Sequence, residues 1–157
     1  MHPLPHRYAA SASAAQSGDV ALDTYDLPSI ISASPSEFGG PGDRWSPETL
    51  LVAAIADCLV LTFRGMAKAS NFEWRSLSAH VSGTLDRVGD GLEFTHFRTH
   101  VLMTIADASD EERARRLIAK AEKACLIARS LKAKVDLEMH VECVPAGLPA
   151  MKGAHHV

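Results

Sequence analysis

The chain has 157 residues, of which 46% are hydrophobic and 22% are charged, a composition that excludes a wholly disordered or fibrous protein. Its formal net charge of -3 leaves no basic excess for a phosphate backbone or an anionic bilayer, so we expect neither nucleic acid nor a membrane as partner. The length predicts a single domain over residues 1–157, with a flexible tail over residues 145–157. The first residues lack the apolar run of a secretory signal, and the run Leu50–Phe63 is too short to cross a bilayer, so we expect a cytoplasmic protein.

The N-terminal third of the chain predicts little regular structure. Residues 6–31 form short stretches interrupted by residues 16–19, a pattern that indicates a weak hairpin of two strands. The loop at residues 38–44 contains three glycines and a proline but lacks the Gly-Lys-Ser/Thr ending of a phosphate-binding loop. We therefore interpret this loop as a mobile lid or a linker.

A long helix is predicted to begin directly after this loop. Ser46 suits the N-cap, Pro47 suits the first helical position, and Glu48 lies near the positive end of the helix dipole. From Thr49 to about Ala69 the residues are apolar on nearly every side, which predicts a helix enclosed on most of its surface.

Alternating apolar and polar residues predict a hairpin over residues 77–105, with its turn at residues 89–91. Residues 109–112 match a capping box, which predicts a second helix whose apolar stripe continues through Cys125 to Ala128. A further period-two pattern over residues 133–143 predicts a last strand. The order of these elements indicates an α+β fold.

The chain contains three cysteines, an odd and sparse number that argues against a secreted disulfide framework. Cys58 lies in the middle of the apolar helix and Cys125 on the inward stripe of the second helix, so both thiols point into the interior and could be neighbours. Inert packing stays an alternative for each of them, because free cysteine is among the most often buried residues. Cys143 falls on the core face of the last strand, and we leave it out of the site.

The eight histidines do not predict a metal site. His96 and His100 lie four apart on a strand and are therefore about 13 Å apart along it, too far to bind one ion. His140 and Cys143 point to opposite faces of their strand. We expect neither a metal nor another cofactor.

The segment Trp45–Cys58 resembles the helix signature of the OsmC/Ohr family, named for osmotically inducible protein C and organic hydroperoxide resistance protein. That family has a Pro-Glu pair at the helix start, a reactive cysteine ten residues after the glutamate, and a second cysteine on a later helix preceded by small residues. Glu48, Cys58 and Ala124–Cys125 occupy these positions. The resemblance implies an intertwined homodimer in which antiparallel sheets wrap around a long buried central helix.

The resemblance also implies a thiol-dependent peroxidase that reduces organic hydroperoxides, with hydrogen peroxide as a further substrate. Cys58 would attack the peroxide and become a sulfenic acid, and Cys125 would convert it to a disulfide. A dithiol reductant, such as a lipoyl-bearing protein, would reopen the disulfide. An arginine held by Glu48 would activate Cys58, and the two candidates are Arg7 and Arg44. We slightly favour Arg7, which we place in the first strand.

Helix geometry places Glu48 and Cys58 about 15 Å apart, so one chain cannot bring them into contact, and the site would be shared across a two-fold dimer. Two positions depart from the family pattern: Asp57 stands where a small residue is usual, and Leu126 where proline is common. A carboxylate facing the cavity of Cys58 would raise the pKa of that thiol. The rival hypotheses are a non-catalytic redox sensor or small-ligand-binding protein on the same fold, and a thioester-handling enzyme that also wraps a sheet around a buried helix.

Overall fold

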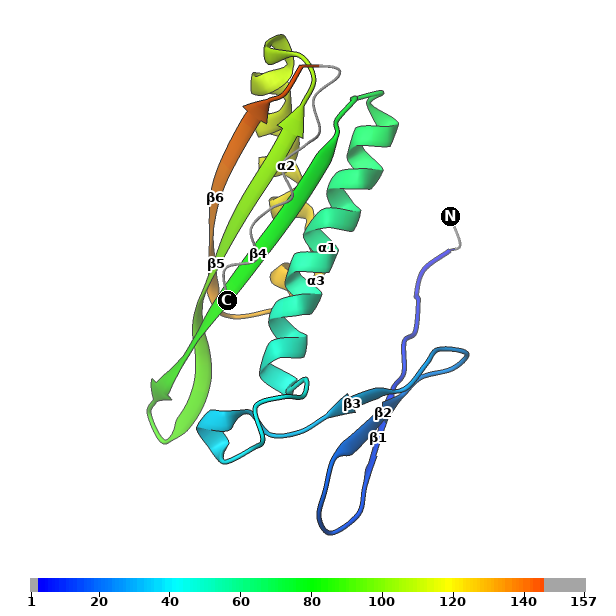
Figure 1. The fold of residues 1–157 in the computed structure, drawn as a ribbon, viewed down its shortest axis with the longest axis vertical. Helices are drawn as coiled ribbons and strands as arrows, with labels where there is room; N and C mark the ends of the chain where they lie inside the picture. The colour runs from blue at the N-terminus through cyan, green and yellow to red at the C-terminus, as the bar shows by residue number, and fades with distance from the viewer. Residues whose placement is uncertain (1–2, 146–157) are drawn as a thin grey trace. The chain divides into compact units, whose positions relative to one another are not determined.

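The computed structural model describes residues 3–145, and the chain divides into two compact units between Leu51 and Val52 (Figure 1). We call them the N-terminal unit and the C-terminal unit. Most of the segment predicted as a flexible tail, residues 146–157, lies outside the described residues.

The N-terminal unit contains a small antiparallel sheet in the order β1-β2-β3, formed by Ser11–Ala14, Val20–Asp23 and Ile30–Ser32. The predicted hairpin is confirmed by the pairing of β1 with β2 around residues 16–19. The third strand was not predicted, because it has only three residues and is too short to show a periodicity.

Backbone hydrogen bonds hold the glycine-rich loop of the N-terminal unit. After the short 3₁₀ helix η1, Ser36–Phe38, the Gly40 N–H donates to the carbonyl oxygen of Pro35 over 3.0 Å. Gly40 lies so close to the chain that a Cβ atom there would come within 1.6 Å of the carbonyl oxygen of Ser34. The loop is therefore a tight, hydrogen-bonded turn.

The long helix α1 extends over Pro47–Ala69, as predicted. The Thr49 N–H donates to the Ser46 hydroxyl over 3.2 Å, and the Ser46 N–H donates to the Thr49 hydroxyl over 2.8 Å. This reciprocal pair satisfies two N–H groups at the helix start, with threonine in the position where a glutamate or glutamine is more usual.

The C-terminal unit contains a three-stranded sheet in the order β4-β5-β6, formed by Ser76–Val88, Gly91–Ile105 and Lys134–Cys143. The hairpin of β4 and β5 is antiparallel, as predicted, but β6 pairs with β5 in parallel. The expectation of antiparallel sheets therefore holds for the β4–β5 pair and is wrong for β6. A parallel neighbour needs a crossover connection, and the chain supplies one between β5 and β6 (Figure 1).

The crossover connection contains a 3₁₀ helix and two α-helices: η2 Ala108–Asp110, α2 Glu111–Ala124 and α3 Leu126–Arg129. The predicted capping box at residues 109–112 does not form. Instead the Asp107 carboxylate accepts a hydrogen bond from the Ser109 N–H over 2.9 Å, which starts a 3₁₀ turn before α2.

One hydrophobic core joins both longer helices to the sheet of the C-terminal unit. Its buried members are Leu59, Phe63, Ala67, Phe72, Val101, Met103, Ile105, Ala114, Ile118, Ala121 and Val141. Phe63 is fully buried and makes edge-to-face contacts with the rings of Phe72 and Trp74. The α+β class is confirmed.

Helix α1 is buried along one stripe rather than on most sides. The buried stripe recurs every four residues and consists of Ile55, Leu59, Phe63 and Ala67, whereas Leu61 on another face is 51% exposed. By length and composition α1 could cross a membrane, with a mean hydropathy of 1.9 in its most apolar window, of which 22% is buried. A core helix of a globular protein meets the same criterion, and the stripe of α1 belongs to the core.

Candidate thiol site

Cys58 lies midway along α1 and is partly buried. Residues four apart on a helix share a face, so Thr62 lies directly beyond Cys58, and its side chain forms a hydrogen bond with the Cys58 sulfur. The long helix thus presents a thiol and a hydroxyl together.

Cys125 lies at a break in the crossover connection. Helix α2 ends at Ala124, Cys125 has extended backbone angles of φ -60° and ψ 112°, and α3 begins at Leu126. The predicted continuous helix through Cys125 to Ala128 was therefore wrong. The Cys125 side chain is only 2% exposed, and its thiol points to the carbonyl oxygen of Ile55 on α1 at 3.9 Å.

The structure brings the two thiols together: Cys58 and Cys125 lie close enough for each to displace the pKa of the other. Burial raises the pKa of the Cys58 thiol, but hydrogen bonds from the Ile127 N–H, the Cys125 thiol, the Leu126 N–H and the Thr62 hydroxyl outweigh burial. The pKa of Cys58 is consequently lower than that of an ordinary cysteine, which increases the thiolate fraction of Cys58 at neutral pH.

The pKa of the Cys125 thiol is displaced in the opposite direction. Burial raises the pKa of Cys125 to about 11, and its hydrogen bond to Cys58 raises it as well, against the lowering effect of the Ala128 and Ile127 N–H groups. Cys58 is therefore the more readily ionised thiol of the pair, and Cys125 the less readily ionised one. The difference in pKa makes Cys58 the better nucleophile at neutral pH, whereas Cys125 keeps its proton.

Glu48 lies in the first turn of α1, and its Oε2 atom is buried with no hydrogen-bond partner among the described residues. A buried carboxylate oxygen without a donor is costly. Its environment therefore suits a cationic side chain, which none of residues 3–145 provides.

The two predicted arginines differ in what they already bind. Arg44 forms ion pairs with Asp19 at 3.0 Å and Asp43 at 2.9 Å, and the hydrogen bond that Arg44 donates to Asp19 is the main reason why the pKa of Arg44 is raised. Arg7 is exposed and precedes β1, which begins at Ser11, so its predicted place in the first strand was wrong.

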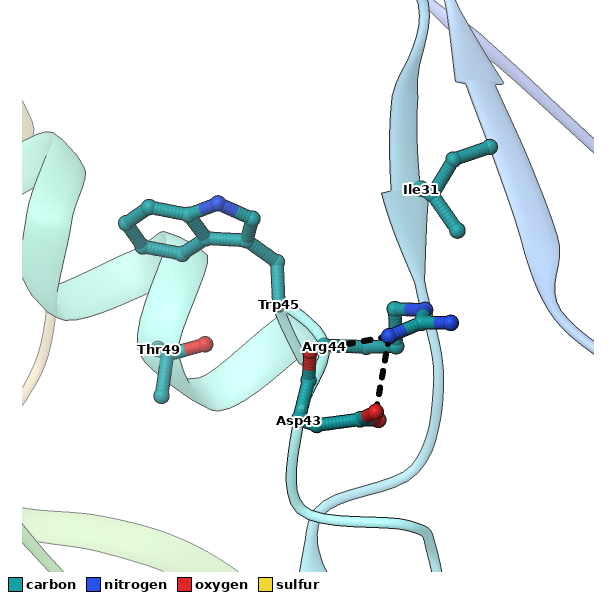
Figure 2. Close-up of a pocket in the computed structure, with 5 residues that line it drawn as sticks. All are labelled: Ile31, Asp43, Arg44, Trp45 and Thr49. Carbon is teal, nitrogen blue, oxygen red and sulfur yellow. Dashed lines mark hydrogen bonds and ion pairs between the residues drawn. The ribbon is translucent and has the colours of Figure 1, made fainter.

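Arg44 also lines an open surface depression of about 320 Å³ in the N-terminal unit. The other lining residues are Ile31, Asp43, Trp45 and Thr49, and Figure 2 shows these side chains with the contacts between Arg44 and Asp43. Because the guanidinium group is already paired there, the depression offers no free charge to a ligand.

Two further predictions concern residues near the thiols. Asp57 is exposed, and it is not among the groups that displace the pKa of Cys58. Cys143 is exposed rather than on the core face, because it ends β6, and its thiol lies 3.5 Å from the carbonyl oxygen of Ala106. Over residues 3–145, no three side chains of the metal-binding types are grouped to hold an ion.

Three groups that lower the pKa of Cys58 were not predicted from the sequence: the Thr62 side chain and the backbone N–H groups of Leu126 and Ile127. Thr62 was accessible to reasoning, since it lies four residues from Cys58 on a predicted helix. The two N–H groups left no signal, because any residue except proline carries one.

Comparison with known proteins extends these findings. Residues 40–140 match the family model of OsmC-like proteins. Uncharacterized protein YmaD of Bacillus subtilis (strain 168) is 30% identical over 109 residues, which are 67% of this chain and 72% of that protein.

Two solved structures share the fold. An OsmC-like protein of unknown function from Vibrio cholerae has a TM-score of 0.79 at 16% identity, covering 87% of this chain and 100% of that chain. An organic hydroperoxide resistance protein OsmC from Legionella pneumophila has a TM-score of 0.70 at 24% identity, covering 90% of this chain and 100% of that chain. The match of the family model over most of the chain establishes that this protein belongs to the OsmC-like family.

Proposed function

We propose that the protein is a thiol-dependent peroxidase that reduces organic hydroperoxides, with Cys58 as the attacking thiolate and Cys125 as the resolving thiol. One observation carries the proposal: the buried Cys125 thiol points to the Ile55 carbonyl oxygen, three residues before Cys58 on α1, and the neighbouring thiols have opposite pKa displacements, with that of Cys58 lowered and that of Cys125 raised to about 11. Membership of a family that includes organic hydroperoxide resistance proteins supports the same reading.

In the first step the Cys58 thiolate attacks the terminal oxygen of the hydroperoxide. The O–O bond breaks, sulfur loses two electrons, and the departing alkoxide takes up a proton and leaves as the alcohol. Cys58 becomes a sulfenic acid. Hydrogen peroxide can react in the same way and releases water.

In the second step the Cys125 sulfur attacks the Cys58 sulfur and displaces its hydroxyl group, which leaves as water with the Cys125 proton. Once Cys58 is a neutral sulfenic acid, Cys125 no longer donates to a thiolate, and this cause of its raised pKa disappears. A dithiol reductant, for which a lipoyl group is the proposed source, then reduces the disulfide through a mixed disulfide.

The proposal includes a cytoplasmic homodimer with shared sites. Glu48 of one subunit would hold an arginine near Cys58 of the other, which would give the buried Oε2 atom of Glu48 its missing donor. Arg7 suits this role better than Arg44, because Arg44 would have to leave Asp19 and Asp43.

The test is consumption of cumene hydroperoxide and hydrogen peroxide with dihydrolipoamide as reductant. We expect Cys58→Ser and Cys125→Ser each to abolish catalytic cycling, whereas Cys143→Ser keeps the wild-type rate. Mass spectrometry of the oxidised wild type should show a Cys58–Cys125 disulfide. Equal turnover in all variants would contradict the proposal. Absence of turnover in the wild type, with the disulfide still formed, would favour the redox sensor.

A further inference from the structure

Helix α2 is attached to α1 and to the segment after α1 at two separate points. Near the start of α2, the Arg113 Nη2 atom donates a hydrogen bond to the carbonyl oxygen of Ser70, and the guanidinium carbon lies 5.2 Å from the centre of the Phe72 ring. Directly after α2, the Cys125 thiol points to the carbonyl oxygen of Ile55 at 3.9 Å. Ser70 follows the last residue of α1, whereas Ile55 lies in its first half, so the two helices run in opposite directions.

The apolar packing of α2 does not by itself fix the position of α2 along α1. The buried residues of α2 are Ala114, Ile118 and Ala121, and two of these three offer only a methyl group to interlock with the core. Apolar burial is non-directional, and a shift of α2 by one helical turn would move it by about 5.4 Å. The sulfurs of a disulfide are about 2 Å apart, so such a shift would take Cys125 out of reach of Cys58.

The contacts of Arg113, in contrast, are directional, and their partner is fixed in the core. The Phe72 ring is 5% exposed and packs edge-to-face against the fully buried ring of Phe63 on α1, with the ring centres 6.4 Å apart. A cation over the face of an aromatic ring and a charged hydrogen bond to a carbonyl oxygen both favour one position of the guanidinium group. Helix α2 thus carries a directional anchor near its start and leads to a thiol that lies about 18 Å further along.

We propose that Arg113 is a positioning residue, whose contacts with Ser70 and Phe72 set the register of α2 on α1 and thereby hold Cys125 within reach of Cys58. The use of the two thiols against peroxide rests on the proposed function, but their ability to form a disulfide with each other does not. Without the anchor, α2 is free to shift, and fewer molecules hold the sulfurs in the geometry that bonding requires. The effective concentration of one thiol toward the other then falls.

The experiment equilibrates the full chain with mixtures of reduced and oxidised glutathione, without peroxide. The two thiols lose two electrons and two protons and form an S–S bond, and one glutathione disulfide is reduced to two glutathione molecules. All variants carry Cys143→Ser, which removes the exposed third thiol. Mass spectrometry after alkylation of the remaining thiols measures the fraction with a Cys58–Cys125 disulfide, and the glutathione ratio at half oxidation gives the effective concentration.

For Arg113→Ala we expect an effective concentration about tenfold lower than that of the parent, because a charged hydrogen bond and a cation–π contact are lost together. Arg113→Lys keeps the positive charge and a donor and should give an intermediate value. The matched control is Arg116→Ala on the same helix. The Arg116 side chain is 71% exposed and pairs only weakly with Glu112, at 3.8 Å, so this variant should keep the parent value.

An unchanged effective concentration in folded Arg113→Ala would overturn the proposal, even if that variant melts at a lower temperature. A fall of equal size in Arg116→Ala would overturn it as well. If Arg113→Ala does not fold, Phe72→Leu decides, because it removes the aromatic face and keeps an apolar side chain: a lowered value supports the anchor, and the parent value overturns it. A lowered value in a protein that does not consume hydroperoxide would refute the proposed function alone, and turnover with an unchanged value would refute the anchor alone.

Discussion

The two units of the chain are stabilised in different ways. In the C-terminal unit, apolar side chains from two helices and the sheet form one buried core. In the N-terminal unit, the buried residues among those the structure describes are two serines, Ser32 and Ser46. Many of its large apolar side chains are exposed, among them Tyr25, Leu27, Ile30, Ile31, Phe38 and Trp45. The C-terminal unit thus carries both the core and the thiol pair, whereas the N-terminal unit leaves several large apolar side chains exposed.

Matched isoleucine truncations give the largest expected contrast between the units. Ile118 is 1% exposed in the core and Ile31 is 44% exposed in β3. Ile118→Ala should lower the free energy of unfolding by about 2–5 kcal/mol, because it leaves a cavity. Ile31→Ala should lower the free energy of unfolding of the single chain far less. Urea denaturation of the two variants measures both changes.

The same pair tests the proposed dimer. Ile31→Ala should make the melting temperature depend more steeply on protein concentration if its surface is covered by a second copy, whereas Ile118→Ala should not. If Ile31→Ala and Ile118→Ala lower the melting temperature equally at every protein concentration, the two units do not differ in how they are stabilised.

A glycine pair gives an intermediate effect and shows what holds the N-terminal unit. Gly40→Ala places a methyl group against the backbone of Ser34, which cannot move aside as a flexible side chain could. The free energy of unfolding of the loop should therefore fall by about 1–3 kcal/mol. Amide hydrogen exchange should then be faster at Ala33, whose N–H donates to Trp45, and little changed in β5. Gly65→Ala in α1 meets open space and should stabilise the helix by up to about 1 kcal/mol. Faster exchange throughout β5 in Gly40→Ala would mean that the units unfold together.

The smallest effect concerns an ion pair on the sheet of the C-terminal unit. Lys134, at 2.7 Å, is the main cause of the lowered pKa of Asp136, with a further hydrogen bond to His96. A carboxyl whose pKa is lower in the folded state stabilises the fold above its unfolded pKa of about 3.9 and loses that contribution as the pH falls. Asp136→Asn should therefore slightly reduce the drop in melting temperature between pH 6 and pH 3. Asp90→Asn in the hairpin turn serves as the control. If the drop in melting temperature is the same in Asp136→Asn as in the wild type, the Lys134–Asp136 pair does not contribute to the pH dependence of stability.

Local signals predicted much of the fold. The cap at Ser46 and the proline after it located the start of α1, and period-two alternation located β4, β5 and β6. Alternation reveals a strand but not its direction, so the parallel pairing of β6 was missed. The helix break at Cys125 was missed for a similar reason: no glycine or proline marks it, and contacts between distant residues decide it.

The sequence could predict which side chains belong to the candidate site, but not how burial and backbone groups affect them. The spacing of Cys58 and Cys125 on inward faces indicated two neighbouring thiols, and the structure brings them into contact. Their opposite pKa displacements could not be read from the sequence, because burial and backbone N–H groups produce them. Arg44 looked available in the sequence, but two aspartates, one of them distant along the chain, already bind it.

The place of Cys125 within the crossover connection has a consequence for the resting stability of the molecule. A covalent bond between the two sulfurs would close a long loop and tether α1 to the segment between β5 and β6, which by loop entropy alone is worth about 4 kcal/mol. The oxidised chain would then resist heat and proteases better than the reduced one. The reductant that restores the thiols would remove this contribution to the free energy of unfolding. After exposure to peroxide, the protein would therefore be more stable until it is reduced again.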